Sequence, residues 1–161
     1  MSDLRPAFIK EIILLAKYDK DIMLLVGDVG YSFAEPFEKE SPGQLINCGI
    51  IEQSMVDIAV GLALSGKKPY VYTVINFILF RAYEQVRNDV CYMNTNVKLV
   101  GVRGKESYKF LGYTHNIAEN EDCKILKELP NIFVALPKTE RMLHSMMQST
   151  YKNKLPTYIR L

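Results

Sequence analysis

Apolar runs of strand length alternate along the chain with amphipathic stretches of helix length. The apolar runs predict strands at 22–27, 44–49, 69–74, 97–102, 132–137 and 157–161. Between them, helical spacing of apolar residues predicts helices over 8–19, 51–65, 80–93, 119–128 and 139–152. Strands joined through helices pair in parallel, because each connection crosses over the sheet. The pattern therefore predicts a doubly wound α/β fold, with a mostly parallel sheet of about six strands and helices on both faces.

The composition fits one globular domain over residues 1–161. Hydrophobic residues make up 48% of the 161 positions and charged residues 24%, which suits a core of ordinary size. A net charge of +2 without a basic run argues against nucleic-acid binding. No apolar run approaches the ~20 residues of a membrane helix. The three cysteines have no metal-type spacing and no secretory signal pattern begins the sequence, so we expect a cytoplasmic protein without membrane contact.

One segment, 47-NCGIIEQSMVDIAVGLALSG-66, places a carboxylate on an apolar helix face. Glu52 shares that face with Met55, Val56 and Ala59. Two alternatives are open: Glu52 lies in solvent at the positive end of the helix dipole, or it is buried. An ionised carboxylate is costly to bury without a partner. Burial would therefore require a partner for Glu52.

Irregular or polar segments follow four of the predicted strands. They are residues 27–30, 49–53, 76–80 and 103–115. The carboxyl ends of parallel strands meet at one edge, where ligands of open α/β sheets bind. We expect a site at this edge.

The individual candidates also have ordinary explanations. Asp28, between glycines, is typical of a turn or a helix N-cap. Phe77 and Phe80, at helical spacing, are typical of a core. His115 lies in the polar segment GYTHN and is a better candidate than His144, which lies in a predicted helix. Glycine-rich phosphate motifs and nucleophile elbows are absent from the sequence.

The segment that begins NCGIIEQ and continues through INFILFRAYEQ to residue 90 resembles the pyrimidine-binding domain of the transketolase family of thiamine diphosphate enzymes. The similarity resumes at GYTHN, ELPNIFVALP and PTYIRL, so it spans roughly residues 22–161. The resemblance implies the thiamine-diphosphate-binding fold, two-carbon (ketol or acyl) transfer and a ketose or 2-oxo acid substrate.

The resemblance also implies roles for individual residues. Glu52 is in register with the glutamate that bonds N1′ of the cofactor's aminopyrimidine and supports its reactive tautomer, and His115 with a histidine that reaches the substrate. The other residues implied to contact the cofactor are Asp28, Ile51, Val74, Phe77 and Phe80. Val74 stands where the family has a first aromatic residue, so this side of the pyrimidine would be less covered.

Two departures concern the substrate. Leu111 stands where the family usually has an acid that reads a sugar hydroxyl, and an apolar side chain cannot accept that hydrogen bond. The stretch NIAENED after His115 is longer than expected. Ordinary pentose phosphates are therefore not expected as substrates.

The family's Gly-Asp-Gly…Asn motif, which holds the diphosphate and Mg²⁺, does not occur in these 161 residues. We expect a separate subunit to supply that site and Mg²⁺, in an α2β2 assembly, and Met1 with the ending PTYIRL favours a natural small subunit over an excised domain. The chain itself is expected to hold no metal. The alternative is a catalytically silent subunit with the same fold.

Overall fold

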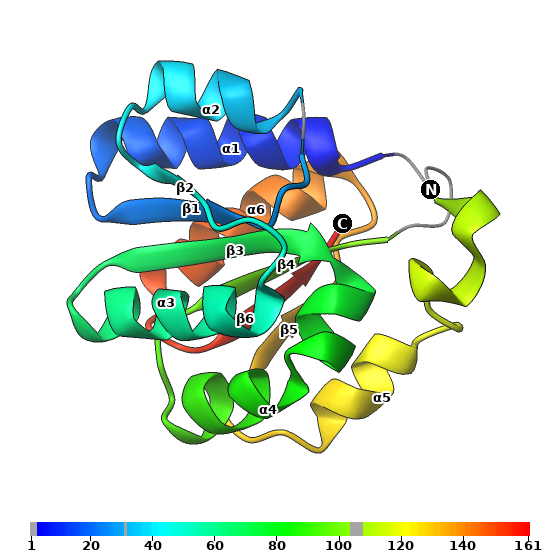
Figure 1. Cartoon of the computed structure of the whole chain (residues 1–161). Coiled ribbons are helices and arrows are strands. Elements are labelled where there is room, and N and C mark those ends of the chain that lie inside the picture. Colours follow the sequence, from blue (N-terminus) through cyan, green and yellow to red (C-terminus); the bar gives the residue numbers. More distant parts are fainter. Residues whose placement is uncertain (1–2, 31, 104–107) are drawn as a thin grey trace.

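In the computed structural model, which describes residues 3–30, 32–103 and 108–161, six strands form one parallel sheet (Figure 1). The strand order is β2-β1-β3-β4-β6-β5. The strands are β1 (Ile22–Val26), β2 (Leu45–Asn47), β3 (Lys68–Val74), β4 (Lys98–Val102), β5 (Phe133–Ala135) and β6 (Thr157–Arg160). All six predicted strands are confirmed, although β2 and β5 are shorter than predicted. The predicted α/β fold is also confirmed, since every pairing is parallel.

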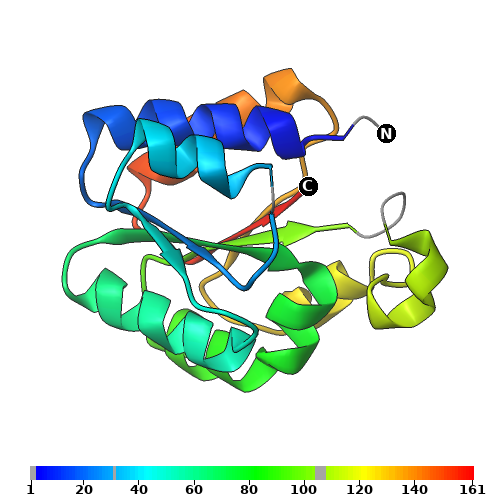
Figure 2. The same ribbon diagram turned by 45° about the horizontal axis from the view of Figure 1, so that its top comes forward.

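Helices cover both faces of this sheet, as Figure 2 shows from a tilted view. One face carries α1 (Arg5–Tyr18), α2 (Ala34–Glu40) and α6 (Glu140–Lys152). The other carries α3 (Glu52–Leu64), α4 (Tyr83–Gln85) and α5 (Glu121–Lys127). None of the helices in the described ranges is long and apolar enough to cross a membrane.

The predicted regular helix over 80–93 is wrong in detail. The chain forms a π-helical segment η1 (Asn76–Arg81), the short α4, and a second π-helical segment η2 (Val86–Tyr92). A π turn closes i→i+5 hydrogen bonds, and apolar spacing alone hardly distinguishes it from an α turn. Such turns are frequent at functional sites.

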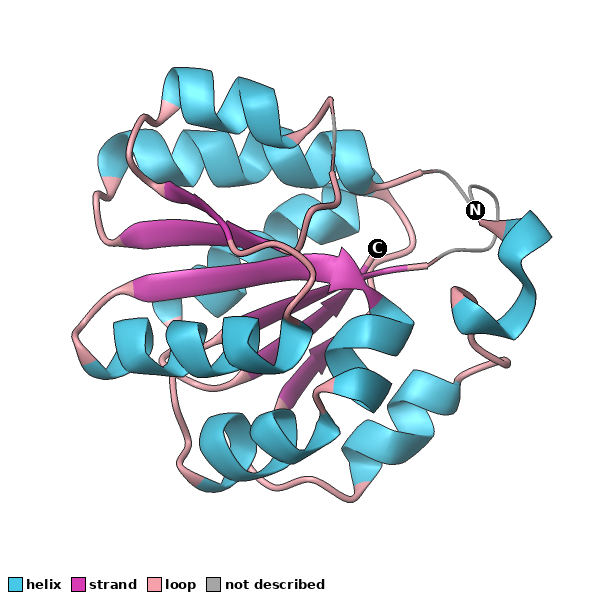
Figure 3. Ribbon diagram, viewed as in Figure 1, coloured by secondary structure: helices cyan, strands magenta, loops and turns pink. Residues whose placement is uncertain are grey.

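Two further elements were not predicted (Figure 3). The short helix α2 buries only Phe37 fully, so it leaves almost no periodic signal. The 3₁₀ segment η3 (Lys109–Thr114) lies in the connection predicted as irregular over 103–115, and residues 104–107 of that prediction lie outside the described residues.

Alternating strand residues build two apolar cores, one on each face. In β1, Leu24 packs in the core under α1 and α6, while Leu25 packs in the core under α3. A parallel sheet covered on both faces requires strands that are apolar throughout. The strand β4 fits this rule, since all five of its residues are buried.

Lys98 is a buried cation at the amino end of β4. It is 1% exposed, and its Nζ donates to Leu155 O at 2.8 Å and to Asn153 Oδ1 at 3.0 Å, with weaker contacts to Asn153 O and Thr157 Oγ1. These oxygens lie between α6 and β6, so Lys98 fastens that turn to the sheet. Burial lowers the pKa of the Lys98 ammonium from 10.5 to about 7.

This burial predicts a pH-dependent stability. The folded pKa lies below the unfolded value, so the unfolded chain binds more protons between about pH 7 and pH 10. The free energy of unfolding should therefore rise as the pH increases above 7, by at most about 1.4 kcal/mol per pH unit. Urea titrations at a series of pH values measure this slope.

The control is Lys98→Met, which removes the titrating group. It should abolish the rise with pH and, because it strands the oxygen acceptors, destabilise the fold by about 1–3 kcal/mol. An unchanged pH slope in this variant would assign the effect to other groups.

Candidate functional site

Glu52 is a buried carboxylate at the first residue of α3. Its side chain is 1% exposed, so of the two alternatives left open by the sequence the structure selects burial. Oε2 accepts a hydrogen bond from Arg81 Nη1 at 2.8 Å. Oε1 is buried as well and has no donor among the described residues. The carboxylate is therefore half paired, and one oxygen is left for a donor from outside the chain.

Arg81, the partner of Glu52, was missed in the sequence. It is the last residue of η1, and its guanidinium carbon lies 4.1 Å from the centre of the Phe77 ring. At this distance the cation interacts with the face of the ring. The four-residue separation of Phe77 and Arg81 was a signal for this contact, because residues so spaced are neighbours on a helix.

His115 lies on the other side of Phe77. The two rings meet edge to face, with centroids 5.0 Å apart and planes at 76°. The Tyr108 ring is 5.7 Å from His115 on a further side. Glu52, Arg81, Phe77 and His115 thus form a continuous series of contacts, which joins the two residues predicted to be catalytic.

Two asparagines hold the turn that carries His115. The Asn76 amide donates to Tyr113 O at 2.9 Å and to Asn116 O at 3.0 Å. The Asn116 amide donates to Tyr108 O at 2.9 Å and to Gly112 O at 2.7 Å. Side chains thus satisfy carbonyls that η3 itself leaves unpaired, so the turn is fixed to η1.

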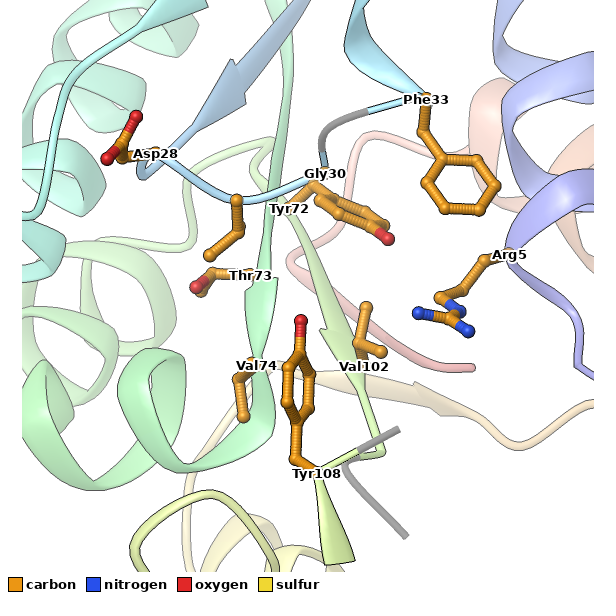
Figure 4. A pocket seen from close by; sticks show the side chains of 10 residues that line it. Arg5, Asp28, Gly30, Phe33, Tyr72, Thr73, Val74, Val102 and Tyr108 are labelled. Carbon is orange, nitrogen blue, oxygen red and sulfur yellow. The ribbon is translucent and has the colours of Figure 1, made fainter. Parts of the chain in front are cut away.

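A pocket of about 290 Å³ lies beyond the carboxyl ends of β1, β3 and β4 (Figure 4). Its polar side chains include those of Tyr72, Thr73 and Tyr108, and Arg5 points into it from α1. Thr73 Oγ1 is buried and has no partner among the described residues. The full lining is Arg5, Asp28, Val29, Gly30, Phe33, Tyr72, Thr73, Val74, Val102 and Tyr108. Of these, the sequence analysis selected Asp28 and Val74.

The backbone of Asp28 is unusual. Its φ is 53°, in the left-handed region, and its N–H donates to Asn47 Oδ1 at 3.1 Å. A left-handed aspartate is uncommon outside turns and functional sites. The structure therefore leaves both the turn interpretation and the functional one in place.

Two other candidates lie at the surface. Ile51 is 45% exposed and Phe80 is 39% exposed. The pocket is not lined by Glu52, Ile51, Phe77 or Phe80. The predicted residues therefore fall into two neighbouring groups, one around Glu52 and one around the pocket, and His115 contacts the Tyr108 ring that belongs to the second.

His144 is distant from this site in its contacts. Its Nδ1 lies 2.8 Å from Glu11 Oε2, between α6 and α1, and its side chain is 58% exposed. Within the described ranges, no group of three or more His, Cys, Asp or Glu side chains is arranged to hold a metal ion.

A family model described as the transketolase pyrimidine-binding domain matches residues 1–161. An apulose-4-phosphate transketolase subunit of Phocaeicola vulgatus is 36% identical over 158 residues, which cover 98% of this chain and 50% of that protein. The putative transketolase C-terminal section of Methanocaldococcus jannaschii is 30% identical over 159 residues, with 98% and 50% covered.

A solved structure described as a split gene transketolase, inactive beta4 tetramer, superposes with a TM-score of 0.85 at 30% identity. The match covers 98% of this chain and 50% of that one. The chain thus spans about half the length of the relatives it matches.

The pairing of Glu52 with Arg81 generates a prediction about stability. The change Arg81→Met removes the donor that neutralises a buried carboxylate and should lower the free energy of unfolding by about 1–3 kcal/mol. Adding Glu52→Gln removes the buried charge and should recover most of that loss. Denaturant unfolding of the two single variants and the double variant measures the coupling, and additive effects would contradict the pairing.

Proposed function

Because this chain belongs to the family of transketolase pyrimidine-binding domains, we propose that it binds the aminopyrimidine of thiamine diphosphate and activates the cofactor for two-carbon transfer. The observation that carries this proposal is Glu52 Oε1, a buried acceptor without a donor among the described residues. Native proteins rarely leave such an atom unsatisfied. A ring N–H of the cofactor at this oxygen would complete its hydrogen bonding.

The surroundings of Glu52 fit this role. Arg81 compensates the charge of the carboxylate through Oε2, so the group can remain an anion while Oε1 accepts from N1′. Phe77 supplies an aromatic ring beside the carboxylate's partner, and an aromatic ring buries a flat heterocycle without competing for its polar edge. Ile51 and Phe80 add apolar surface at the exposed edge.

Thiamine diphosphate, when bound, supplies the thiazolium that stores the electron pair of the transferred unit. The residues of this chain bind and orient. Glu52 holds the proton shared with N1′, and His115 offers an imidazole nitrogen to a substrate oxygen. Asp28 and Val74 lie along the adjoining pocket and would line the space between cofactor and substrate.

We further propose that the 290 Å³ pocket receives a small hydroxylated substrate of the ketose class. Hydroxyl groups of Thr73, Tyr72 and Tyr108 and the Arg5 guanidinium are suited to sugar hydroxyls and an anionic group. The Phocaeicola vulgatus relative is named for a sugar phosphate, apulose-4-phosphate, which agrees with this class. Leu111, in place of an acid, remains a predicted departure from ordinary pentose phosphates.

The proposal includes a partner subunit that holds the diphosphate and Mg²⁺. Supporting it are the absence of a Gly-Asp-Gly…Asn motif from the sequence and a chain about half as long as its relatives. We propose an α2β2 assembly in the cytoplasm with the Glu52 edge facing the partner, and a chain that is inactive alone. The competing proposal is a silent subunit that keeps the fold and the assembly but contributes nothing to turnover.

The change Glu52→Gln separates these two proposals. In the assembled complex it should reduce kcat at least about 100-fold, because the amide cannot hold the shared proton. Steady-state turnover, together with calorimetric titration of thiamine diphosphate in Mg²⁺, measures the effect.

Glu84→Gln is the matched control, since Glu84 lies on the exposed surface of α4. It should leave turnover and cofactor affinity unchanged. Wild-type turnover by an assembled Glu52→Gln complex would support the silent subunit instead.

The change Thr73→Val tests the substrate pocket. It keeps the shape of the side chain and removes the unpartnered hydroxyl, so kcat/KM in the complex should fall about tenfold while cofactor affinity stays constant. Thr73→Ser, which retains the hydroxyl, should stay near wild type. Equal losses in both variants would indicate a packing effect and contradict the proposed contact.

A further inference from the structure

The Thr114 hydroxyl makes two short contacts and has one proton to donate. Its oxygen is 2.7 Å from Leu111 O and 2.8 Å from His115 Nδ1. Leu111 O is a carbonyl and can only accept, so the hydroxyl proton must lie between Thr114 and Leu111. The contact to Nδ1 is then a hydrogen bond only if the imidazole donates.

From this proton count we infer that Thr114 is a positioning residue that fixes His115 in the Nδ1–H tautomer. The proton on Nδ1 points to Thr114 Oγ1, and the neutral ring then carries its lone pair on Nε2. A hydrogen bond at one ring nitrogen commonly decides the state of the other in this way. The inference deepens the proposed function, on which its catalytic meaning rests, although the tautomer itself is a property of this chain.

The fold supports a fixed imidazole. The turn bearing Thr114 and His115 is tied by the two Asn76 bonds and the two Asn116 bonds, so Leu111 O cannot easily turn away from the hydroxyl. Gly112 has a φ of 57° within this turn, a conformation that L side chains rarely adopt. The edge of Phe77 restricts rotation of the imidazole from one side.

The assigned tautomer gives His115 a defined chemical role. An Nε2 lone pair accepts a hydrogen bond from a substrate hydroxyl, and in a proton transfer the hydroxyl O–H bond breaks as the Nε2–H bond forms, with the electron pair left on oxygen. The opposite tautomer would present an N–H to the same oxygen. Thr114 therefore decides whether His115 acts as an acceptor or as a donor.

The test is a ¹⁵N measurement of the histidine tautomer in the 161-residue chain without cofactor. Histidine labelling gives only two residues, and His144→Gln assigns the remaining signals to His115. At about pH 8, above the ordinary imidazole range, the long-range ¹H–¹⁵N pattern should show a protonated Nδ1 and an unprotonated Nε2. A protonated Nε2 in the wild type would overturn the inference.

Matched variants isolate the hydroxyl. Thr114→Val keeps the branched shape but removes the acceptor, so the ring should shift to the Nε2–H form, and the two nitrogen signals should exchange their character. Thr114→Ser should retain the Nδ1–H form. Identical spectra for the valine and serine variants would overturn the inference, because the hydroxyl would then have no influence.

Turnover of the assembled complex separates this inference from the proposed function. If both hold, Thr114→Val should reduce kcat/KM at least about tenfold, and Thr114→Ser should restore it. A confirmed tautomer in a complex that shows no transferase activity would refute the function and keep the inference. An active complex whose valine variant keeps wild-type kcat/KM would refute the role of Thr114 alone.

Discussion

A buried and half-paired carboxylate at the start of α3 is the constraint on which this site depends. Glu52 is removed from water, and Arg81 neutralises it through one oxygen while the other lacks a donor among the described residues. Burying an ionised group in this way is costly unless its remaining lone pairs are used. The arrangement is reasonable for a domain that binds a protonated heterocycle, and Arg81 allows the free chain to fold before that ligand is present.

Polar groups at the two ends of the sheet are treated differently. Lys98, at the amino end of β4, has its donors directed to several oxygens and fastens a turn. At the carboxyl end, Glu52, Thr73, Asn76 and Asn116 each retain a buried oxygen without a partner, four of the seven such atoms among the described residues. Stability is built at one end, and unsatisfied hydrogen bonding gathers at the other, where ligands of open parallel sheets bind.

The segment after β3 connects these unsatisfied groups. The π turns of η1 bring Phe77 against Arg81 on one side and His115 on the other, and Asn76 anchors the His115 turn. A change in one member therefore affects the position of the rest. Proposed cofactor acid and proposed substrate histidine are coupled through side chains of a single short segment.

The hydrophobic pattern by itself determined the six strands, the α/β class and the apolar face around Glu52, because burial imposes periods of two and 3.6 on the sequence. The motifs then identified the family and the position of His115. Only the tertiary structure decided that Arg81 pairs with Glu52 and that Thr114, rather than water, contacts Nδ1. Pairings of this kind depend on turn geometry, and the π turns and the 3₁₀ segment η3 leave no distinct period in the sequence. The pocket beside Asp28 likewise required the fold, because its lining comes from segments as distant as Arg5 and Tyr108.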